Sequence, residues 1–215
     1  MKLKTRTLLA IPCLAAFLAV TGAAAHASTI NGSVWEGASH YPNPLSPTAP
    51  SGPASATFTL SNAGDIFNLS GVTGNDTYTI GTFLTSGGDT VNFLTGAGVA
   101  GNSLDNTVFE FTGYLNLAPG TYTIHHDDGM FLYINGVQVI DSGDPTASIP
   151  SSFVVGPDGT GLVPFQLLYA EVNGSPAVLS GRLGDLAQTP EPSSFVLLGS
   201  GLLGVAGLVR RRLGV

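Results

Sequence analysis

The Asn135-Gly136 pair limits the fold of this chain more than any other feature, because it predicts a tight β-hairpin. Both central residues of a type I′ turn need positive φ, which asparagine and glycine adopt at the lowest cost. The turn sets Ile134 opposite Val137 and Leu132 opposite Val139. One face is then predicted to carry Leu132, Ile134, Val137 and Val139, and the other Phe131, Tyr133, Gln138 and Ile140. Apolar residues on both faces favour strands buried in an all-β sandwich.

Two adjacent carboxylates, Asp127 and Asp128, stand at the mouth of this hairpin. Neighbouring side chains of a regular strand point to opposite faces, so the two act together only in a loop, where Gly129 permits an unusual backbone. Carboxylates held close repel each other unless a proton or a cation lies between them. Calcium, with about six to eight oxygen ligands in flexible geometry, suits a loop better than magnesium. The alternative is a solvated Asp-Asp-Gly turn.

The N-terminus is typical of a secretory signal peptide over residues 1–27. Met1 to Arg6 is basic, Leu8 to Val20 is apolar, and Ala25-His26-Ala27 provides a cleavage site. An uncleaved membrane anchor is the alternative, although the apolar run is short for a bilayer span. The only cysteine, Cys13, lies inside this segment. We therefore expect an exported mature protein without disulfides.

The charge distribution excludes a nucleic-acid-binding function. Of the seven Lys and Arg residues, Arg182 alone lies between the signal peptide and the C-terminal arginines, whereas the fourteen Asp and Glu residues lie between Glu36 and Glu191. No cationic patch for phosphate groups can be built from one arginine. The excess of acidic over basic residues favours cation binding. The alternative is that the negative charge simply keeps an exported domain soluble.

The region before residue 107 is predicted to contain short strands and loops. Strands are expected at 32–36, 56–61, 65–70, 77–85 and 90–94, and no segment here shows a capped helical pattern. The residues Pro42, Pro44, Pro47, Pro50 and Pro53 predict a long surface loop between the first two strands. Trp35 is either a core residue or a platform on which a sugar ring stacks.

Two motifs in this region are interpreted as turns. The segment 71–78 is similar to one calcium-binding nonapeptide of RTX proteins, but stacked copies are missing. The segment 96–101 fits G-x-G-x-x-G without the helix and the acidic residue that a dinucleotide site needs.

Catalytic chemistry is not indicated, and we expect a protein that is not an enzyme. No G-x-S-x-G motif is present, and the acidic residues have no evident general-base partner. His125 and His126 should face opposite sides of a strand, which argues against a shared zinc ion. Asp141, Asp144 and Asp158 are secondary ligand candidates or ordinary solvated loop acids.

From residue 108 to 183 the chain resembles the PA14 domain. The matching motifs are Phe109–Leu115, Ala118–Ile124, Asp127–Gly129, Leu132–Gly136, Val139–Asp141 and Phe165–Glu171. The resemblance implies a β-sandwich of a family found in adhesins, toxins and glycosidases. In its lectin-like members an aspartate pair joined by a cis peptide holds calcium that also binds sugar hydroxyls, which points to Asp127 and Asp128. In those members a later loop also supplies an asparagine ligand. The resemblance places Asn173 or Glu171 nearest to that position.

The C-terminus combines Pro190-Glu191-Pro192, an uncharged run at 193–209 and Arg210-Arg211-Arg212. The run is just long enough for a transmembrane helix, and the arginines should stay on the cytoplasmic side of the inner membrane. This segment, residues 189–215, resembles the PEP-CTERM sorting signal of Gram-negative bacteria. The resemblance implies processing by an exosortase and delivery to the cell surface or exopolysaccharide matrix. A plain C-terminal anchor is the alternative.

The sequence thus predicts an antiparallel PA14-like β-sandwich over residues 28–188. The first functional hypothesis is a calcium-dependent carbohydrate-binding protein whose partner is an extracellular glycan or exopolysaccharide. The second is a structural surface protein in which any calcium only stiffens the loop. A third is an accessory domain of a hydrolase that has lost its enzyme.

Overall fold

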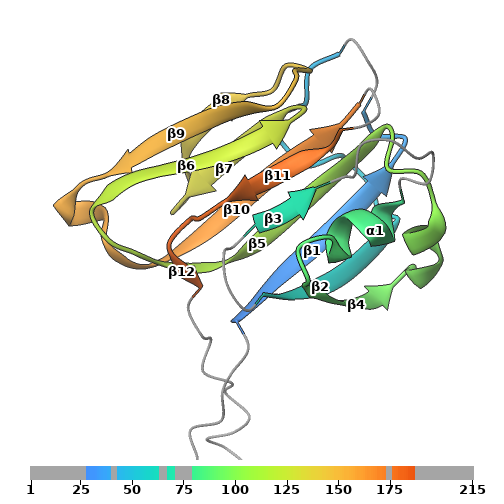
Figure 1. The fold of residues 1–215 in the computed structure, drawn as a ribbon, viewed down its shortest axis with the longest axis horizontal. Coiled ribbons are helices and arrows are strands. Elements are labelled where there is room, and N and C mark those ends of the chain that lie inside the picture. The colour runs from blue at the N-terminus through green and yellow to red at the C-terminus, as the bar shows by residue number, and fades with distance from the viewer. Residues whose placement is uncertain (1–27, 40–42, 63–66, 71–78, 173–175, 187–215) are drawn as a thin grey trace, which may run out of the picture.

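Two antiparallel β-sheets packed face to face form most of the described part of the protein (Figure 1). The structure is a computed structural model, and it describes residues 28–39, 43–62, 67–70, 79–172 and 176–186. The predicted signal peptide at 1–27 and the predicted transmembrane helix at 193–209 lie outside the described residues. Among the described helices, none is long and apolar enough to cross a membrane. The all-β antiparallel prediction is confirmed.

The larger sheet has the strand order β4-β2-β1-β5-β10-β7-β8, and β12 also pairs with β5. Its strands are β1 (Ser28–Glu36), β2 (Ala56–Asn62), β4 (Thr90–Thr95), β5 (Thr107–Leu117), β7 (Met130–Ile134), β8 (Val137–Ser142), β10 (Gly161–Glu171) and β12 (Asp185–Leu186). The two longest strands, β5 and β10, pair along their whole length at the centre of the sheet. They carry most of the fully buried aromatic residues described below.

The smaller sheet has the order β3-β11-β6-β9. Its strands are β3 (Phe67–Ser70), β6 (Gly120–Asp127), β9 (Ile149–Val155) and β11 (Val178–Gly181). The short helix α1 (Ile80–Thr85) lies beside β3, over the end of the larger sheet that the smaller one leaves uncovered (Figure 1). Two 3-10 turns, η1 (Ala97–Gly101) and η2 (Pro157–Gly159), complete the described elements.

Aromatic side chains fill the space between the two sheets. Phe109 and Phe111 of β5 and Tyr169 of β10 are fully buried, and Phe83 of α1 stacks on Tyr169 with ring centroids 5.6 Å apart. Phe67 of β3 meets the edge of Phe111 from the opposite sheet at 5.2 Å. These contacts join the two sheets and α1 into one hydrophobic core.

The proline-rich loop between β1 and β2 lies against the outer face of the larger sheet rather than standing free. Leu45 is buried in a second apolar cluster with Val108, Phe131, Leu168, Ala170 and Val172. The hydroxyl of Tyr133 donates to the carbonyl of Pro47 at 2.7 Å, and Trp35 Nε1 donates to the carbonyl of Gly52 at 3.3 Å. Trp35 is therefore half-buried at the base of this loop, where its indole N–H anchors the chain.

The predicted hairpin register is correct at the turn and wrong farther along. Ile134 pairs with Val137 as expected, but Leu132 pairs with Ile140 instead of Val139. A β-bulge places Val139 as an extra residue in β8, which moves Ile140 onto the core side with Leu132. The bulge has no local sequence signal, because apolar residues occupy both faces of the hairpin.

Two further predictions are wrong. The strand expected at 77–85 is replaced over Ile80–Thr85 by α1, whose N-terminus has a capping box between Thr79 and Thr82. The second concerns the end of the domain, where the apolar segments 165–171 and 177–183 of the sequence predict a closing pair of strands. They belong to different sheets, because β10 pairs with β5 and β7 whereas β11 pairs with β3 and β6.

Candidate functional site

The carboxylate pair lies where β6 passes into β7. Asp127 is the last residue of β6, Asp128 follows it, and the peptide bond between them is cis. The resemblance to lectin-like PA14 domains implied this cis bond. Both side chains are buried, with exposed fractions of 3% for Asp127 and 0% for Asp128.

The carboxylate of Asp128 holds two other segments of the chain in place. Its Oδ1 accepts a hydrogen bond from the backbone N–H of Thr146 at 2.9 Å, and its Oδ2 accepts one from Val172 at 2.9 Å. Thr146 belongs to the loop between β8 and β9, and Val172 directly follows β10. Asp128 therefore joins three segments that are distant in sequence, through charge-assisted hydrogen bonds.

Asp127 faces the same β8–β9 loop as Asp128. Burial, and then the neighbouring charge of Asp128, raise the pKa of Asp127 from 3.8 to about 6, while a hydrogen bond from the backbone of Ser148 acts in the opposite direction. Thr146 and Ser148 are two residues apart, so both carboxylates are directed toward one short stretch of this loop. The two carboxylates therefore approach the same loop, and their role as ligands of one ion stays a prediction.

His126 is a structural partner of the pair and not a zinc ligand shared with His125. His125 is exposed and His126 is fully buried, as expected for neighbours on a strand. The ring of His126 lies with Nδ1 at 2.6 Å from the carbonyl oxygen of Asp128 and Nε2 at 2.8 Å from the hydroxyl of Ser151. Since a carbonyl only accepts, Nδ1 carries the proton. Burial lowers the pKa of His126, which favours this neutral form.

Glu171, the last residue of β10, brings a third carboxylate close to the pair. Its side chain is 1% exposed, Oε2 accepts a hydrogen bond from the Tyr169 hydroxyl at 3.3 Å, and Oε1 has no hydrogen-bond partner. Burial, followed by the charges of Asp128 and Asp127, raises the pKa of Glu171 to about 9. An acid with an unpaired buried oxygen is either protonated or neutralised by a cation.

The chemistry of these donors fits calcium, although the described residues do not complete a site. All candidate atoms are oxygens, which suit a hard cation, and one of them is an orphaned buried oxygen of Glu171. In the part of the chain that the structure describes, no group of three or more His, Cys, Asp or Glu side chains is arranged to hold a metal ion. Asn173 lies outside the described residues. The ligand roles of Asn173 and Glu171 therefore stay predictions.

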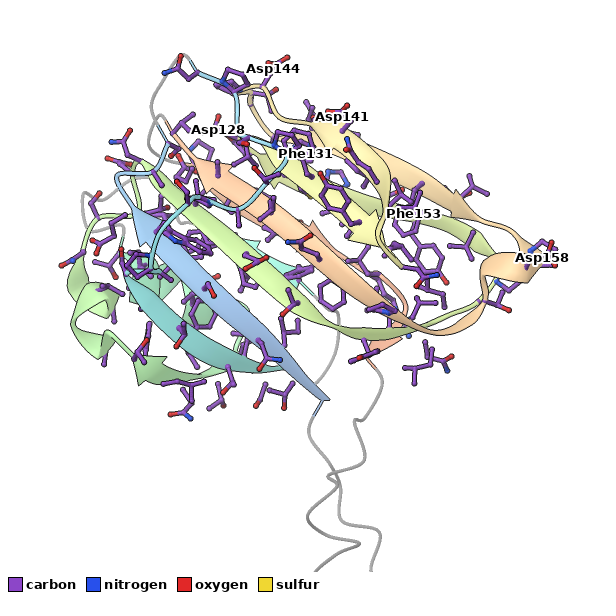
Figure 2. The ribbon with its side chains drawn as sticks, turned by 180° about the vertical axis from the view of Figure 1, so that it is seen from behind. Asp128, Phe131, Asp141, Asp144, Phe153 and Asp158 are labelled. Atoms are coloured by element: carbon purple, nitrogen blue, oxygen red, sulfur yellow. The ribbon has the colours of Figure 1, made fainter. Side chains whose placement is uncertain are left out.

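The secondary acidic candidates are divided between two ends of the sandwich. Asp141 and Asp144 lie at the same end as Asp128, whereas Asp158 lies at the opposite end, in η2 (Figure 2). Asp141 and Asp144 line an open groove of about 470 Å³ beside the proline-rich loop. Asp158 is thus too distant to serve a site at Asp128, while the other two lie at the same end of the sandwich (Figure 2).

The comparisons with known proteins agree with this geometry. The profile of the PA14 domain family matches residues 70–176. This chain is a PA14-domain protein. The match begins well before residue 108, so segments that the sequence could only describe as short strands and loops belong to the PA14 domain as well. The profile of the PEP-CTERM protein-sorting motif matches residues 188–212, which marks the chain for export to the cell surface.

The solved structures that the chain matches include two PA14 domains. The PA14 domain of the MpAFP antifreeze protein has 19% identity and a TM-score of 0.48, covering 74% of this chain and 93% of that one. The PA14 sugar-binding domain from an RTX adhesin has 21% identity and a TM-score of 0.46, covering 76% and 95%. A β-glucosidase from Kluyveromyces marxianus in complex with glucose has 8% identity and a TM-score of 0.35, covering 80% and 17%. No curated protein sequence matches the chain.

Proposed function

We propose that the PA14 domain is a calcium-dependent carbohydrate-binding module of a protein associated with the cell surface or the exopolysaccharide matrix. The observation that carries the proposal is the buried Asp127-Asp128 pair, whose carboxylates face one loop, close to the orphaned oxygen of Glu171. Three buried acids placed together are costly unless protons or a cation neutralise them.

In this proposal Asp127 and Asp128 hold the ion, and Glu171 or Asn173 completes its ligand set. Bound calcium supplies open coordination positions for neighbouring hydroxyl groups of a sugar. The chain itself places the pair: Asp128 fixes the backbone at Thr146 and Val172, and His126 fixes the carbonyl of Asp128. The β8–β9 loop, which both carboxylates face, is then the wall that meets the sugar.

The test is calorimetric titration of calcium into the purified protein, followed by a glycan-array screen with and without chelator. The variant Asp127→Asn/Asp128→Asn removes the charges and keeps the size of both side chains. Asp141→Asn/Asp144→Asn is the matched control, because these acids lie at the same end of the sandwich but in the open groove (Figure 2). Saturable calcium binding that only the first variant loses, with chelator-sensitive glycan binding, supports the proposal. An absence of calcium binding in the unaltered protein contradicts it.

A structural surface protein is the second candidate function. It is favoured by the hydrogen bonds of Asp128 to Thr146 and Val172, because a carboxylate that already joins three segments needs an ion only for further stiffening. Calcium binding that raises the melting temperature, with no glycan retained on the array, would support this second candidate.

Delivery is proposed to depend on an exosortase in the inner membrane that recognises Pro190, Glu191 and Pro192. Arg210, Arg211 and Arg212 would keep the end of the chain on the cytoplasmic side until processing. Replacing Pro190-Glu191-Pro192 with alanines should leave the protein in the membrane fraction, where immunoblotting of fractionated cells detects the unprocessed chain. An unchanged distribution between the fractions would contradict this proposal.

A further inference from the structure

The outer face of the larger sheet carries a continuous row of uncharged polar side chains. Each residue of the row is the direct cross-strand partner of the next, so the row passes over every strand from β4 to β8. In that order the residues are Asn92, Thr59, Asn31, Thr112, Gln166, Tyr133 and Gln138. All of them are partly or largely exposed. This set is the polar row.

The alternation of side chains along each strand places the polar row on the solvent side. The neighbours of its members along the strands, such as Leu60, Phe111 and Leu167, are fully buried in the core. Adjacent strands lie about 4.8 Å apart, so six intervals give a row roughly 29 Å long. Figure 2 turns this side toward the viewer, with β1, β5 and β10 in front. The proline-rich loop packs on the Tyr133 end of the row. The five residues from Asn92 to Gln166, roughly 19 Å, can therefore contact consecutive units of an extended polymer.

The polar row is free of charge in a chain with fourteen acidic residues. In the neighbouring row, Glu110 accepts a hydrogen bond from Gln166 Nε2 at 2.5 Å, and Asp141 lies at the far corner in the groove beside the proline-rich loop. No member of the row carries a charge that would pair with a cationic group of a partner. A second copy of this chain, or a polyanion, would bring like charge against the acidic body.

An exposed aromatic ring lies directly beside the polar row. Tyr114, with 44% of its surface exposed, follows Thr112 on the same face of β5 and pairs with Pro164 of β10. The flat ring and its hydroxyl combine an apolar face with a polar tip. Tyr114 can therefore stack on a sugar ring while the row provides hydrogen bonds.

We propose that the polar row and Tyr114 form a second glycan-contacting surface, which takes an extended neutral polysaccharide and needs no calcium. Asn and Gln amides and Thr and Tyr hydroxyls both donate and accept hydrogen bonds, as sugar hydroxyls do. The surface is separate from the proposed calcium site, because the carboxylate pair is buried at the end of β6 in the other sheet. It extends the proposed carbohydrate-binding function to a second site, which does not require calcium.

The test is depletion of the full chain from solution by insoluble polysaccharides in the presence of EDTA. The insoluble probes are cellulose, a β-1,3-glucan and chitin. Soluble alginate, an acidic polysaccharide, is added as a competitor in a separate arm. The variants are Thr112→Glu, which places a charge at the centre of the row, and Tyr114→Ala. Thr121→Glu is the matched control, because Thr121 is an exposed strand residue of the smaller sheet. Melting temperatures confirm that each variant folds.

We expect retention on at least one neutral polysaccharide in EDTA, weakened about tenfold by Thr112→Glu and by Tyr114→Ala and unchanged by Thr121→Glu. No competition by alginate is expected. Failure to be retained on all three probes in EDTA overturns the proposal, as does an equal loss in Thr121→Glu. Retention that chelation abolishes also overturns it, and assigns the binding to the proposed calcium site instead.

Discussion

The buried hydroxyl of Tyr169 donates a hydrogen bond to the main-chain carbonyl of Asp127, so the aromatic core is tied directly to the carboxylate pair. The same hydroxyl contacts Glu171, and the ring stacks on Phe83 of α1. The candidate site is thus supported by the packing of the sandwich, and not only by the loops around it. Alterations of this support should change both stability and calcium binding.

Removing the hydroxyl of Tyr169 should destabilise the fold and weaken calcium binding together. Tyr169→Phe keeps the stacked ring but leaves a buried carbonyl of Asp127 without its donor, which costs about 1–3 kcal/mol. Denaturant unfolding and calorimetric titration measure the two effects. Tyr114→Phe is the control, because Tyr114 is exposed. Equal stability of the two variants would show that the Tyr169 bond contributes nothing.

Replacing Asp128 should cost more stability than replacing any exposed acid. Asp128→Ala leaves the backbone N–H groups of Thr146 and Val172 without their acceptor, and we expect a loss of about 3 kcal/mol. Asp141→Ala, at an exposed position, should change the free energy of unfolding by less than about 0.5 kcal/mol. Chemical denaturation in EDTA separates this effect from calcium. Similar values for both variants would contradict the anchoring role.

Without calcium, the protein should lose stability as pH rises from 7 to 9. The folded chain keeps a proton on Glu171 up to about pH 9, whereas the unfolded chain releases it near 4.5. The folded state then binds more protons, so the contribution of Glu171 is complete below about pH 4.5 and is lost as pH rises through about 9. The slope is about 1.4 kcal/mol per pH unit near pH 7 and falls to about half of that at pH 9, where the folded state begins to release the proton. Thermal unfolding in EDTA measures it.

The variant Glu171→Gln is the control for this pH dependence. It keeps a polar side chain of similar size beside the Tyr169 hydroxyl and removes the titrating proton, so its melting temperature in EDTA should stay level between pH 7 and 9. At pH 9 it should exceed the unaltered protein by several degrees. A melting temperature that falls with the same slope in both proteins would exclude Glu171 as the cause.

The stabilisation by calcium should be smaller at pH 5 than at pH 7.5. The pKa of Asp127 is about 6, so at pH 5 calcium must displace a proton from this carboxylate before it can bind. The rise in melting temperature caused by millimolar calcium measures the effect at each pH. Magnesium at the same concentration is the control, because it dehydrates reluctantly and demands octahedral geometry. A calcium effect that is equal at both pH values would contradict the role of Asp127.

Several elements could be predicted because their cause is local. The Asn135-Gly136 turn follows from positive φ at both residues, and the structure has φ of 51° and 76° there. The opposite orientation of His125 and His126 follows from strand alternation. By contrast, α1 was missed because a six-residue helix with threonine caps resembles a β-rich segment in sequence. The bulge at Val139 was missed because either register would bury apolar residues.

The sequence by itself determined the all-β class, the hairpin, the acidic body and the adjacency of Asp127 and Asp128, since each depends on backbone preferences or residue order. Only the tertiary structure decided that Asp128 binds the backbone at Thr146 and Val172, that Glu171 is buried beside the pair, and that the polar row is continuous. These relationships join residues from strands distant in the chain. Sheet order and register create them, and neither is encoded in any one segment.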